Sequence, residues 1–485
     1  MEFFDREREL EEAKELEKRG SRMLVLYGKR RVGKTVLIKE LFKGSNSKKL
    51  YFFVPKNEKI DSALGTYEAQ AREVLGLKEY EKIGSIGDLL KVLFEYSKKE
   101  KIIAAFDEFQ NFSYICPEAI DLLQKEWDMQ HDAANLSIAI SGSVVGMIKD
   151  IFTERGSPLF KRAYNMMELK ELSMEKTFEL MSQLGISSFE DKLTLYFIFG
   201  GVIFYYSLID YYGVHTSGEA IKKLLLSPVA PLKNTVKEDM IEAFGNSSAT
   251  YFSILEGIAM GKNTNNEVAA HAGLKETSLP RYISDLKSLL GVIDTATLPT
   301  REPKRGSKRN TIVITDSFYN FWFYAVSRNS SYYEIDDMES LAAKLAGALP
   351  LFSGFAFEKF SHKFVEFLSK KGAIFHVDRV GNWYGKDPEK PKGMNREEID
   401  VVAIGNKSRD ILFAECKWQN EPVGISVYGE LKRKARLVQW HNSGRREHYA
   451  LFSKSGFTEE MKMLARAEGV MLFDLESIEK AMLLK

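Results

Sequence analysis

The octapeptide GKRRVGKT constrains the fold of this chain more than any other stretch. It fits the pattern G-x-x-x-x-G-K-[ST], follows an apolar run and precedes the helical run VLIKELF. In that context Gly28 and Gly33 let the backbone curl, so that its N–H groups point at phosphate oxygens. Lys34 reaches the outer phosphates, and Thr35 offers a hydroxyl to a magnesium ion at a helix N-terminus that favours anions. The predicted phosphate site therefore comprises Gly28, Lys29, Arg30, Arg31, Val32, Gly33, Lys34 and Thr35.

Short apolar runs alternate with helical segments through the first third of the chain. The runs at 23–27, 50–54, 102–106 and 136–140 have the composition of strands buried on both faces. Buried strands joined by helices predict a parallel α/β sheet, and ligands bind at the carboxyl ends of such strands. This edge gathers the phosphate loop, the acidic pair after the third run and Ser141-Gly142-Ser143 after the fourth. One serine hydroxyl is expected to contact the γ-phosphate or the attacking water; the alternative is a plain turn at the end of the strand.

The acidic pair that follows the third strand is Asp107-Glu108. We expect Asp107 to hold the magnesium ion and Glu108 to polarise the attacking water. The alternative is an ordinary acidic pair that opens a helix. Further on, Arg155 and Arg162 flank GSPLFK, and Arg162 is a candidate to complete the site in cis or from a neighbouring subunit, against the alternative of a surface arginine.

These segments together resemble a known family. FFDREREL, the Arg-Arg within the phosphate loop, FDEFQ, SGS and SPLFKR are similar to the archaeal-type AAA ATPases, which belong with the STAND class of signalling NTPases. The resemblance covers about residues 1–245 and implies ATP with Mg²⁺, an ATPase core over 1–170 and a helical lid over 171–245. The family's Gly-Gly-x-Pro element lacks its proline here, since the chain reads Gly200-Gly201-Val202-Ile203.

Residues 246–320 predict a winged helix-turn-helix. Two short amphipathic helices surround Gly273, and a basic loop, REPKRGSKRN, precedes the strand TIVIT. One interpretation is DNA binding through phosphate contacts; the alternative is a structural module that clamps the ATPase. The candidate DNA contacts are Arg281, Arg301, Lys304, Arg305, Lys308 and Arg309, with Lys287 beside Arg281 on the second helix.

A second α/β pattern covers 350–485, with a helix at 355–370 and strands at 373–378, 398–404 and 411–417. The last two strands flank Gly-Asn-Lys-Ser and predict a hairpin. Asp400 and Glu415 lie symmetrically about the centre of that turn, so they should face each other across the ladder. Lys417, two residues after Glu415, shares its face. Two carboxylates and a lysine suit magnesium-dependent phosphodiester hydrolysis; the alternative is a solvated charged hairpin.

This arrangement resembles the D…E-x-K pattern of the restriction-endonuclease-like PD-(D/E)XK nucleases. The resemblance implies that Glu358, on the preceding helix, is a further metal ligand. Lys432 or Lys434 on the following helix is then expected beside the site. The predicted architecture is thus an α/β P-loop sheet, a helical lid, a winged helix-turn-helix and a restriction-endonuclease-like domain.

Bulk properties add few limits. The 485 residues predict about three or four domains, and 69 Lys plus Arg against 68 Asp plus Glu leave no bulk charge that steers the chain to nucleic acid or membrane. Two cysteines, the charged N-terminal segment and the short apolar stretch at 195–209 indicate a cytoplasmic protein without a membrane partner, which can oligomerise.

Two functions follow from the sequence. The first is an ATP-regulated, metal-dependent nuclease that acts on DNA. The second is a STAND-like ATPase switch, or a DNA-binding regulator, whose C-terminal domain does not cleave.

Overall fold

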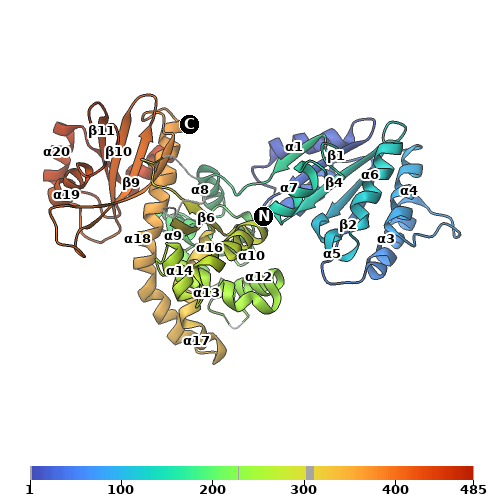
Figure 1. Cartoon of the computed structure of the whole chain (residues 1–485), viewed down its shortest axis with the longest axis horizontal. Coiled ribbons are helices and arrows are strands. Elements are labelled where there is room, and N and C mark those ends of the chain that lie inside the picture. The colour runs from blue at the N-terminus through green and yellow to red at the C-terminus, as the bar shows by residue number, and fades with distance from the viewer. Residues whose placement is uncertain (1–2, 228, 302–310, 484–485) are drawn as a thin grey trace. The chain divides into compact units, whose positions relative to one another are not determined.

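The computed structural model describes residues 3–227, 229–301 and 311–483 (Figure 1). The chain divides into two compact units. Unit 1 comprises Met1–Leu172 with Val202–Ser207 and Ser284–Gly291, and unit 2 comprises the remainder. Unit 2 thus comprises Ser173–Gly201, Leu208–Ile283 and Val292–Lys485.

Unit 1 is built on a parallel five-stranded sheet in the order β2-β3-β4-β1-β5. The parallel sheet expected from the apolar runs is confirmed; only β5 was not predicted, because it is four residues long and half-exposed. The strands are β1 (Arg22–Tyr27), β2 (Lys48–Phe53), β3 (Ile102–Asp107), β4 (Leu136–Gly142) and β5 (Asn165–Glu168).

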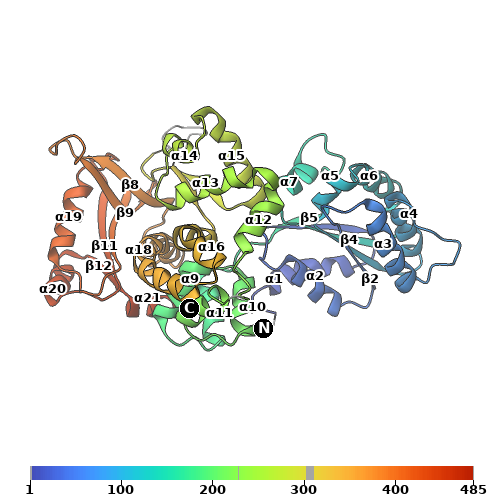
Figure 2. The ribbon, with the colours of Figure 1, turned by 90° about the horizontal axis from the view of Figure 1, so that it is seen from below.

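Helices cover both faces of this sheet (Figures 1 and 2). Ala13 of α1 and Leu37 of α2 pack with Leu24 and Ala105 on one face. The other face packs against α3, α4, α6 and α7. The helices are α1 (Glu7–Lys14), α2 (Lys34–Lys43), α3 (Ile60–Leu75), α4 (Ile86–Ser97), α5 (Phe112–Ile115), α6 (Glu118–Gln130) and α7 (Val145–Thr153).

Unit 2 begins with helices and a small antiparallel sheet. The apolar stretch at 195–209 is a helix, a turn at Gly200 and a second helix, of which residues 203–207 belong to unit 1. Helices α13 to α15 precede the paired strands β6 and β7. The elements are α8 (Met174–Gln183), α9 (Phe189–Phe199), α10 (Ile203–Tyr211), α11 (Ser217–Leu224), α12 (Thr235–Phe244), α13 (Ser248–Ala259), α14 (Asn265–His271), α15 (Leu279–Asp285), β6 (Ile293–Ala296) and β7 (Thr311–Ile314).

The C-terminal part of unit 2 carries a mixed five-stranded sheet in the order β12-β11-β10-β9-β8. Strand β9 is antiparallel to both of its neighbours, β8 and β10, and β10, β11 and β12 are parallel. The elements are α16 (Ser317–Phe321), α17 (Ser330–Glu334), α18 (Met338–Lys370), β8 (Arg379–Lys386), β9 (Arg396–Gly405), β10 (Asp410–Lys417), α19 (Ile425–Ala435), β11 (Arg446–Ser453), α20 (Glu459–Glu468), β12 (Met471–Asp474) and α21 (Leu475–Leu483).

One strand prediction is wrong. Residues 373–378 are not a strand; the extended segment begins at Arg379 and forms β8. Residues 373–377 instead complete the end of α18, where Ala373 N–H donates to the Leu368 carbonyl and Val377 N–H to Ser369 Oγ. Strand β8 was not predicted because it is an edge strand with two glycines and an irregular register. These features interrupt the alternation of buried and exposed side chains that marks a strand in sequence.

Helix α18 is the one helix of the described residues long and apolar enough, by composition, to cross a membrane. Its apolar side chains have protein partners. Phe357 and Phe364 contact Phe452 of β11, and Phe360 contacts Phe178 of α8. Core packing therefore accounts for part of this hydrophobicity, whereas Leu351 and Phe355 of the same helix are exposed.

Candidate functional sites: a phosphate loop and a carboxylate cluster

The phosphate loop joins β1 to α2, as its sequence context predicted. Gly33 is the residue before the helix and has a φ of 99°, a left-handed conformation that favours glycine. Gly28 has a φ of 154°, and a Cβ there would lie 2.2 Å from the carbonyl oxygen of Leu169. Both positions therefore require glycine: Gly33 because of its left-handed conformation, and Gly28 because the backbone of Leu169 approaches it closely.

Lys34 is folded back across the loop. Its Nζ donates to the carbonyls of Gly28 and Lys29, both at 2.9 Å, and its side chain is buried. Burial lowers the pKa of Lys34, and the nearby carboxylates of Glu108 and Asp107 partly offset this effect. The ammonium therefore lies inside the loop, where outer phosphates are expected.

Asp107 accepts hydrogen bonds from three hydroxyl groups. Thr35 Oγ1 donates to its Oδ2 at 2.7 Å, Tyr51 donates to the same oxygen at 2.5 Å, and Ser141 donates to Oδ1. The threonine hydroxyl and the carboxylate thus lie together, and both are hard oxygen ligands of the kind Mg²⁺ prefers. The donor set fits a magnesium ion.

Glu108 lies beside Asp107 in a left-handed conformation, with a φ of 56°. Its Oε2 accepts from Ser143 Oγ at 2.6 Å and from Gln110 Nε2 at 2.5 Å. Both serines of Ser141-Gly142-Ser143 therefore contact the acidic pair. Tyr51 was missed because it belongs to no motif and reaches Asp107 through the pairing of β2 with β3. Gln110 was missed although it ends the FDEFQ segment, in the turn that follows Glu108.

The other loop residues have separate partners. Lys29 lies 3.4 Å from Glu171, the guanidinium of Arg31 lies over the ring of Phe204, and Val32 is buried. Arg30 follows Lys29 in the same loop. Ile203 stands where the Gly-Gly-x-Pro element has its proline, and its Cγ2 lies 3.5 Å from where a Cβ of Gly33 would be.

Arg162 lies away from this loop in the described chain. Its guanidinium makes a bidentate pair with Asp128, at 2.8 and 2.6 Å, near the end of α6. The chain around it leads to Tyr164, whose N–H bonds Met23 at the start of β1, so Arg162 lies by the amino ends of the strands. The in-cis role predicted for Arg162 does not agree with this position, because the phosphate loop lies at the carboxyl ends.

In unit 2, the β9–β10 hairpin has the expected register. Ala414 pairs with Val401, so positions 415 and 400 are next along the ladder. Asp400 Oδ2 accepts the backbone N–H of Cys416 at 2.8 Å, and Lys417 Nζ lies 3.1 Å from Glu415. The turn symmetry thus placed these residues correctly.

Three carboxylates gather beside this hairpin. Glu358 of α18 and Glu398 and Asp400 of β9 each offer an oxygen within 4.8 Å of the others. We call these three residues the carboxylate cluster. Glu398 was missed, although its spacing of two from Asp400 on one strand was a visible signal. Three clustered carboxylates suit a divalent cation such as Mg²⁺ or Mn²⁺.

The cluster has a high electrostatic cost without a cation. Burial, then Asp400 and Glu398, raise the pKa of Glu358. Burial, then Glu415, raise the pKa of Asp400. Asn382 Nδ2 lies 3.5 Å from Glu358 and 3.3 Å from Glu398, a weak neutral partner. A bound cation would remove this repulsion.

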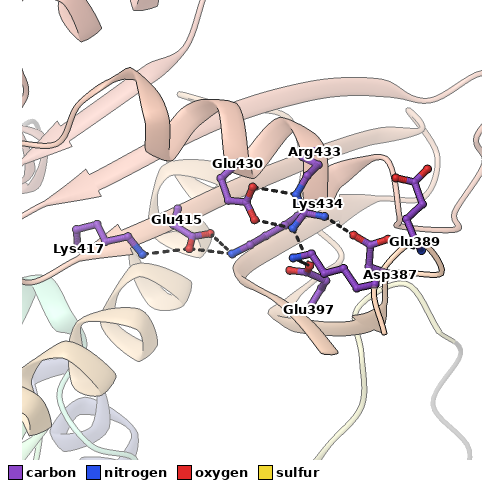
Figure 3. A network of polar contacts seen from close by, with 9 residues as sticks. Asp387, Glu389, Glu397, Glu415, Lys417, Glu430, Arg433 and Lys434 are labelled. Atoms are coloured by element: carbon purple, nitrogen blue, oxygen red, sulfur yellow. Dashed lines mark hydrogen bonds and ion pairs between the residues drawn. The ribbon is translucent and has the colours of Figure 1, made fainter. Parts of the chain in front are cut away.

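Glu415, predicted as a metal ligand, is outside the cluster in this structure. Lys417 and Lys434 each place Nζ 3.1 Å from its Oε1 (Figure 3). Burial would lower the pKa of Lys417, but Glu415 and Asp400 outweigh this effect and raise it. The carboxylate is thus neutralised by two ammonium groups rather than shared with the cluster.

The helix that carries Lys434 is anchored by its neighbour. Arg433 contacts Asp387 at 2.6 Å, Glu397 at 2.7 Å and Glu430 at 2.5 Å (Figure 3). These pairs tie α19 to β9 and so fix Lys434 beside Glu415. Lys432, the alternative to Lys434, instead pairs with Glu468.

Of the predicted DNA contacts, Arg281 and Arg301 are exposed. Arg281 belongs to α15, and the Arg301 carbonyl accepts from Arg379. Lys304, Arg305, Lys308 and Arg309 lie outside the described residues.

The chain is similar to known proteins along nearly its whole length. Residues 3–205 match an ATPase domain predominantly from Archaea, and residues 322–434 match a family of archaeal and bacterial proteins of unknown function. A Methanocaldococcus jannaschii protein, itself uncharacterized, is 27% identical over 483 residues, 98% of this chain and 99% of its own. The structure of a Walker-type ATPase of Pyrococcus abyssi is similar, with 19% identity and a TM-score of 0.53, covering 66% of this chain and 96% of that one. The two family matches therefore fall on different parts of the chain, the ATPase domain on residues 3–205 and the family of unknown function on residues 322–434.

Proposed function

We propose that this protein is an ATP-hydrolysing enzyme that couples its P-loop domain to metal-dependent hydrolysis of phosphodiester bonds, with DNA as the substrate. The observation that carries the second half is the carboxylate cluster, three acids from two distant elements within 4.8 Å of one another. Such repulsion is costly unless a cation offsets it. The ATPase half rests on the match over residues 3–205 and on the geometry around Lys34.

In the ATPase half, Lys34 neutralises the outer phosphates once it leaves the carbonyls it now bonds. Thr35 and Asp107 hold Mg²⁺, which supplies charge neutralisation on the transferring phosphoryl group. Glu108 orients the attacking water, and its hydrogen bonds from Ser143 and Gln110 fix the carboxylate for that role. Binding of ATP replaces the internal contacts of Lys34 with contacts to phosphate.

In the second half, Glu358, Glu398 and Asp400 hold the divalent cation, which supplies an activated water and stabilises negative charge. Lys417 stays protonated, since its pKa is raised, and it neutralises charge on the phosphate. Lys434 and Lys417 together hold Glu415 beside Asp400.

We assign DNA contact to the region of α13 to α15 and β6–β7, as a winged helix-turn-helix. Three helical segments precede an antiparallel pair whose connecting segment is basic in sequence. Arg281 is exposed on the second helix of the predicted motif, and Arg301 is exposed at the start of that basic segment. Contacts of this kind fix position on phosphates rather than read sequence.

A plasmid-cleavage assay tests the proposal. Wild-type protein is incubated with plasmid, ATP and Mg²⁺ or Mn²⁺, and Asp400→Asn is compared with Glu389→Gln, an exposed acid of the same domain. We expect Asp400→Asn to lower cleavage by at least about 100-fold, since even outer-shell partners of metal ligands cost 10–100-fold. The control should remain within about twofold. No cleavage by the wild type with any divalent cation would overturn the hydrolase.

One observation favours the second candidate, a STAND-like ATPase switch or DNA-binding regulator without cleavage. Glu415 is held by two lysines and lies outside the cluster, whereas a nuclease of the resembled type uses it on the metal. Metal-independent DNA binding with ATP-dependent affinity, together with no cleavage, would establish this candidate instead.

A further inference from the structure

Tyr51 belongs to β2, the strand beside the one that ends at Asp107. Backbone pairing places it opposite Ala105 of β3. Its ring packs on the face of the sheet that α2 covers, in the same apolar cluster as Leu37 of that helix. Helix α2 carries Thr35 in its first turn. The ring of Tyr51 is therefore held between the sheet and the helix that carries a proposed magnesium ligand.

The hydroxyl of Tyr51 donates to a carboxylate rather than to a neutral group. Its oxygen lies 2.5 Å from Oδ2 of Asp107. A buried tyrosine hydroxyl usually finds a hydrogen-bond partner, and for Tyr67 of α3 that partner is the carbonyl oxygen of Phe53, at 2.6 Å. A hydrogen bond to an ionised acceptor is shorter and stronger than one to a carbonyl. Tyr51 thus makes a charge-assisted bond to the ligand set, whereas Tyr67 makes an ordinary bond within the fold.

Asp107 has a donor for each lone pair of its two oxygens. The N–H of Glu108 donates to Oδ1 at 3.0 Å, beside the hydroxyl of Ser141. Oδ2 accepts from Thr35 at 2.7 Å and from Tyr51. An ionised carboxylate offers about four lone pairs in all. Both oxygens of this buried side chain are therefore fixed in direction, and Tyr51 supplies one of the two contacts that fix Oδ2.

The position of Oδ2 also determines how the Thr35 hydroxyl points. A hydroxyl group has one proton and two acceptor lone pairs. The proton of Thr35 is directed at Oδ2 of Asp107, so its oxygen can offer a lone pair to a cation. If Oδ2 moved, the Thr35 hydroxyl would lose this direction. A residue that holds Oδ2 therefore orients both proposed magnesium ligands at once.

We propose that Tyr51 is a positioning residue of the ATPase site, which holds the carboxylate of Asp107 and, through it, the hydroxyl of Thr35 in the orientation that binds Mg²⁺. The inference rests on the proposed ATPase and adds a residue of β2 to the magnesium-binding groups of α2 and β3. Without the phenol, Oδ2 keeps Thr35 as its single donor, and one lone pair of a buried carboxylate has no partner. Outer-shell partners of this kind account for about 10–100-fold in metal affinity.

A nucleotide-binding assay on the full-length protein tests this role. The probe is a fluorescent, non-hydrolysable ATP analogue, whose affinity is measured in EDTA and over a Mg²⁺ titration. We expect Tyr51→Phe to raise the Mg²⁺ concentration for half-maximal binding by about 10–100-fold and to keep the affinity in EDTA within about twofold of the wild type. The phenol contacts the metal ligands, so the metal requirement should change most. In ATP hydrolysis the half-saturating Mg²⁺ concentration should rise in parallel, and kcat at saturating Mg²⁺ should fall by less.

The matched control is Tyr67→Phe, which removes a buried hydroxyl of the same unit that bonds a backbone carbonyl. This variant should keep the Mg²⁺ dependence of the wild type, and melting temperatures verify that both variants are folded. The inference would be overturned by a folded Tyr51→Phe with wild-type Mg²⁺ dependence, or by an equal loss of affinity in EDTA and in Mg²⁺. A kcat that falls while the Mg²⁺ dependence stays unchanged would also overturn it. A wild type that binds the analogue under no condition would instead remove the proposed ATPase itself.

Discussion

The two candidate sites of this chain are built in opposite ways. The phosphate loop is one contiguous segment between β1 and α2, and its acidic neighbour Asp107 already has three hydroxyl partners. The carboxylate cluster joins Glu358 to two residues of β9, Glu398 and Asp400, that follow it by 40 positions or more, and a weak amide lies between Glu358 and Glu398. A site made of backbone is stable without its ligand, whereas a site made of like charges needs one.

The largest expected effect breaks the first site alone. Lys34→Ala removes the buried ammonium of the loop, and we expect kcat for ATP hydrolysis to fall by about 10²–10³-fold, the range for loss of one preorganised electrostatic contact. Lys39→Ala, an exposed lysine on the same helix, is the control. Divalent-cation binding at the carboxylate cluster, followed by calorimetry, should stay unchanged. A loss of cation binding in Lys34→Ala would show that the two sites are not separately built.

The next prediction tests the claim that backbone conformation and backbone contacts determine the shape of the phosphate loop. Gly28→Ala places a Cβ 2.2 Å from the Leu169 carbonyl oxygen, and we expect a loss of about 1–3 kcal/mol in the free energy of unfolding. Gly20→Ala shares the positive φ, at 92°, but nothing lies within 4 Å of its Cβ. Urea denaturation should therefore show the larger loss in Gly28→Ala; equal losses would mean that the φ alone matters.

A third prediction concerns pH and tests the like charges. The raised pKa values of Glu358 and Asp400 mean that the folded state binds protons more tightly than the unfolded state. Stability from these groups is therefore complete below their ordinary pKa of about 4 and is lost as pH rises above it. We expect the melting temperature of the metal-free protein to fall as pH rises above that value, and we expect added Mn²⁺ to restore the melting temperature. The double variant Glu358→Gln with Asp400→Asn should weaken this dependence of melting temperature on pH. A double variant with the same pH dependence as the wild type would contradict the proposed repulsion within the cluster.

The smallest expected effect concerns Lys434. Its removal leaves Glu415 with Lys417 alone, so more negative charge faces Asp400. We expect Lys434→Ala to raise cation affinity by a few fold and Lys432→Ala, whose partner is Glu468, to change nothing. Lower affinity in Lys434→Ala, measured in the same titration, would place Glu415 outside the electrostatic reach of the cluster.

The success of the sequence-based predictions also differs between features made of neighbouring residues and features made of distant ones. The four apolar runs, the glycines of the loop and the register of the β9–β10 hairpin are local or symmetric features, and all of them agree with the structure. The failures are tertiary in origin. Strand β8 is an edge strand without a clean period, and Arg162 lies at the opposite edge of the sheet from the loop that its spacing suggested.

The sequence alone determined the phosphate loop and the placement of Asp107, because a backbone conformation and a strand end are set by neighbouring residues. Only the tertiary structure decided that Glu398 joins Glu358 and Asp400 while Glu415 is taken by two lysines. That choice depends on how α18 and α19 pack against one sheet, and packing between distant elements leaves no mark in a single stretch of residues. The same packing encloses a cavity of about 400 Å³ beside the cluster, which no sequence motif predicted.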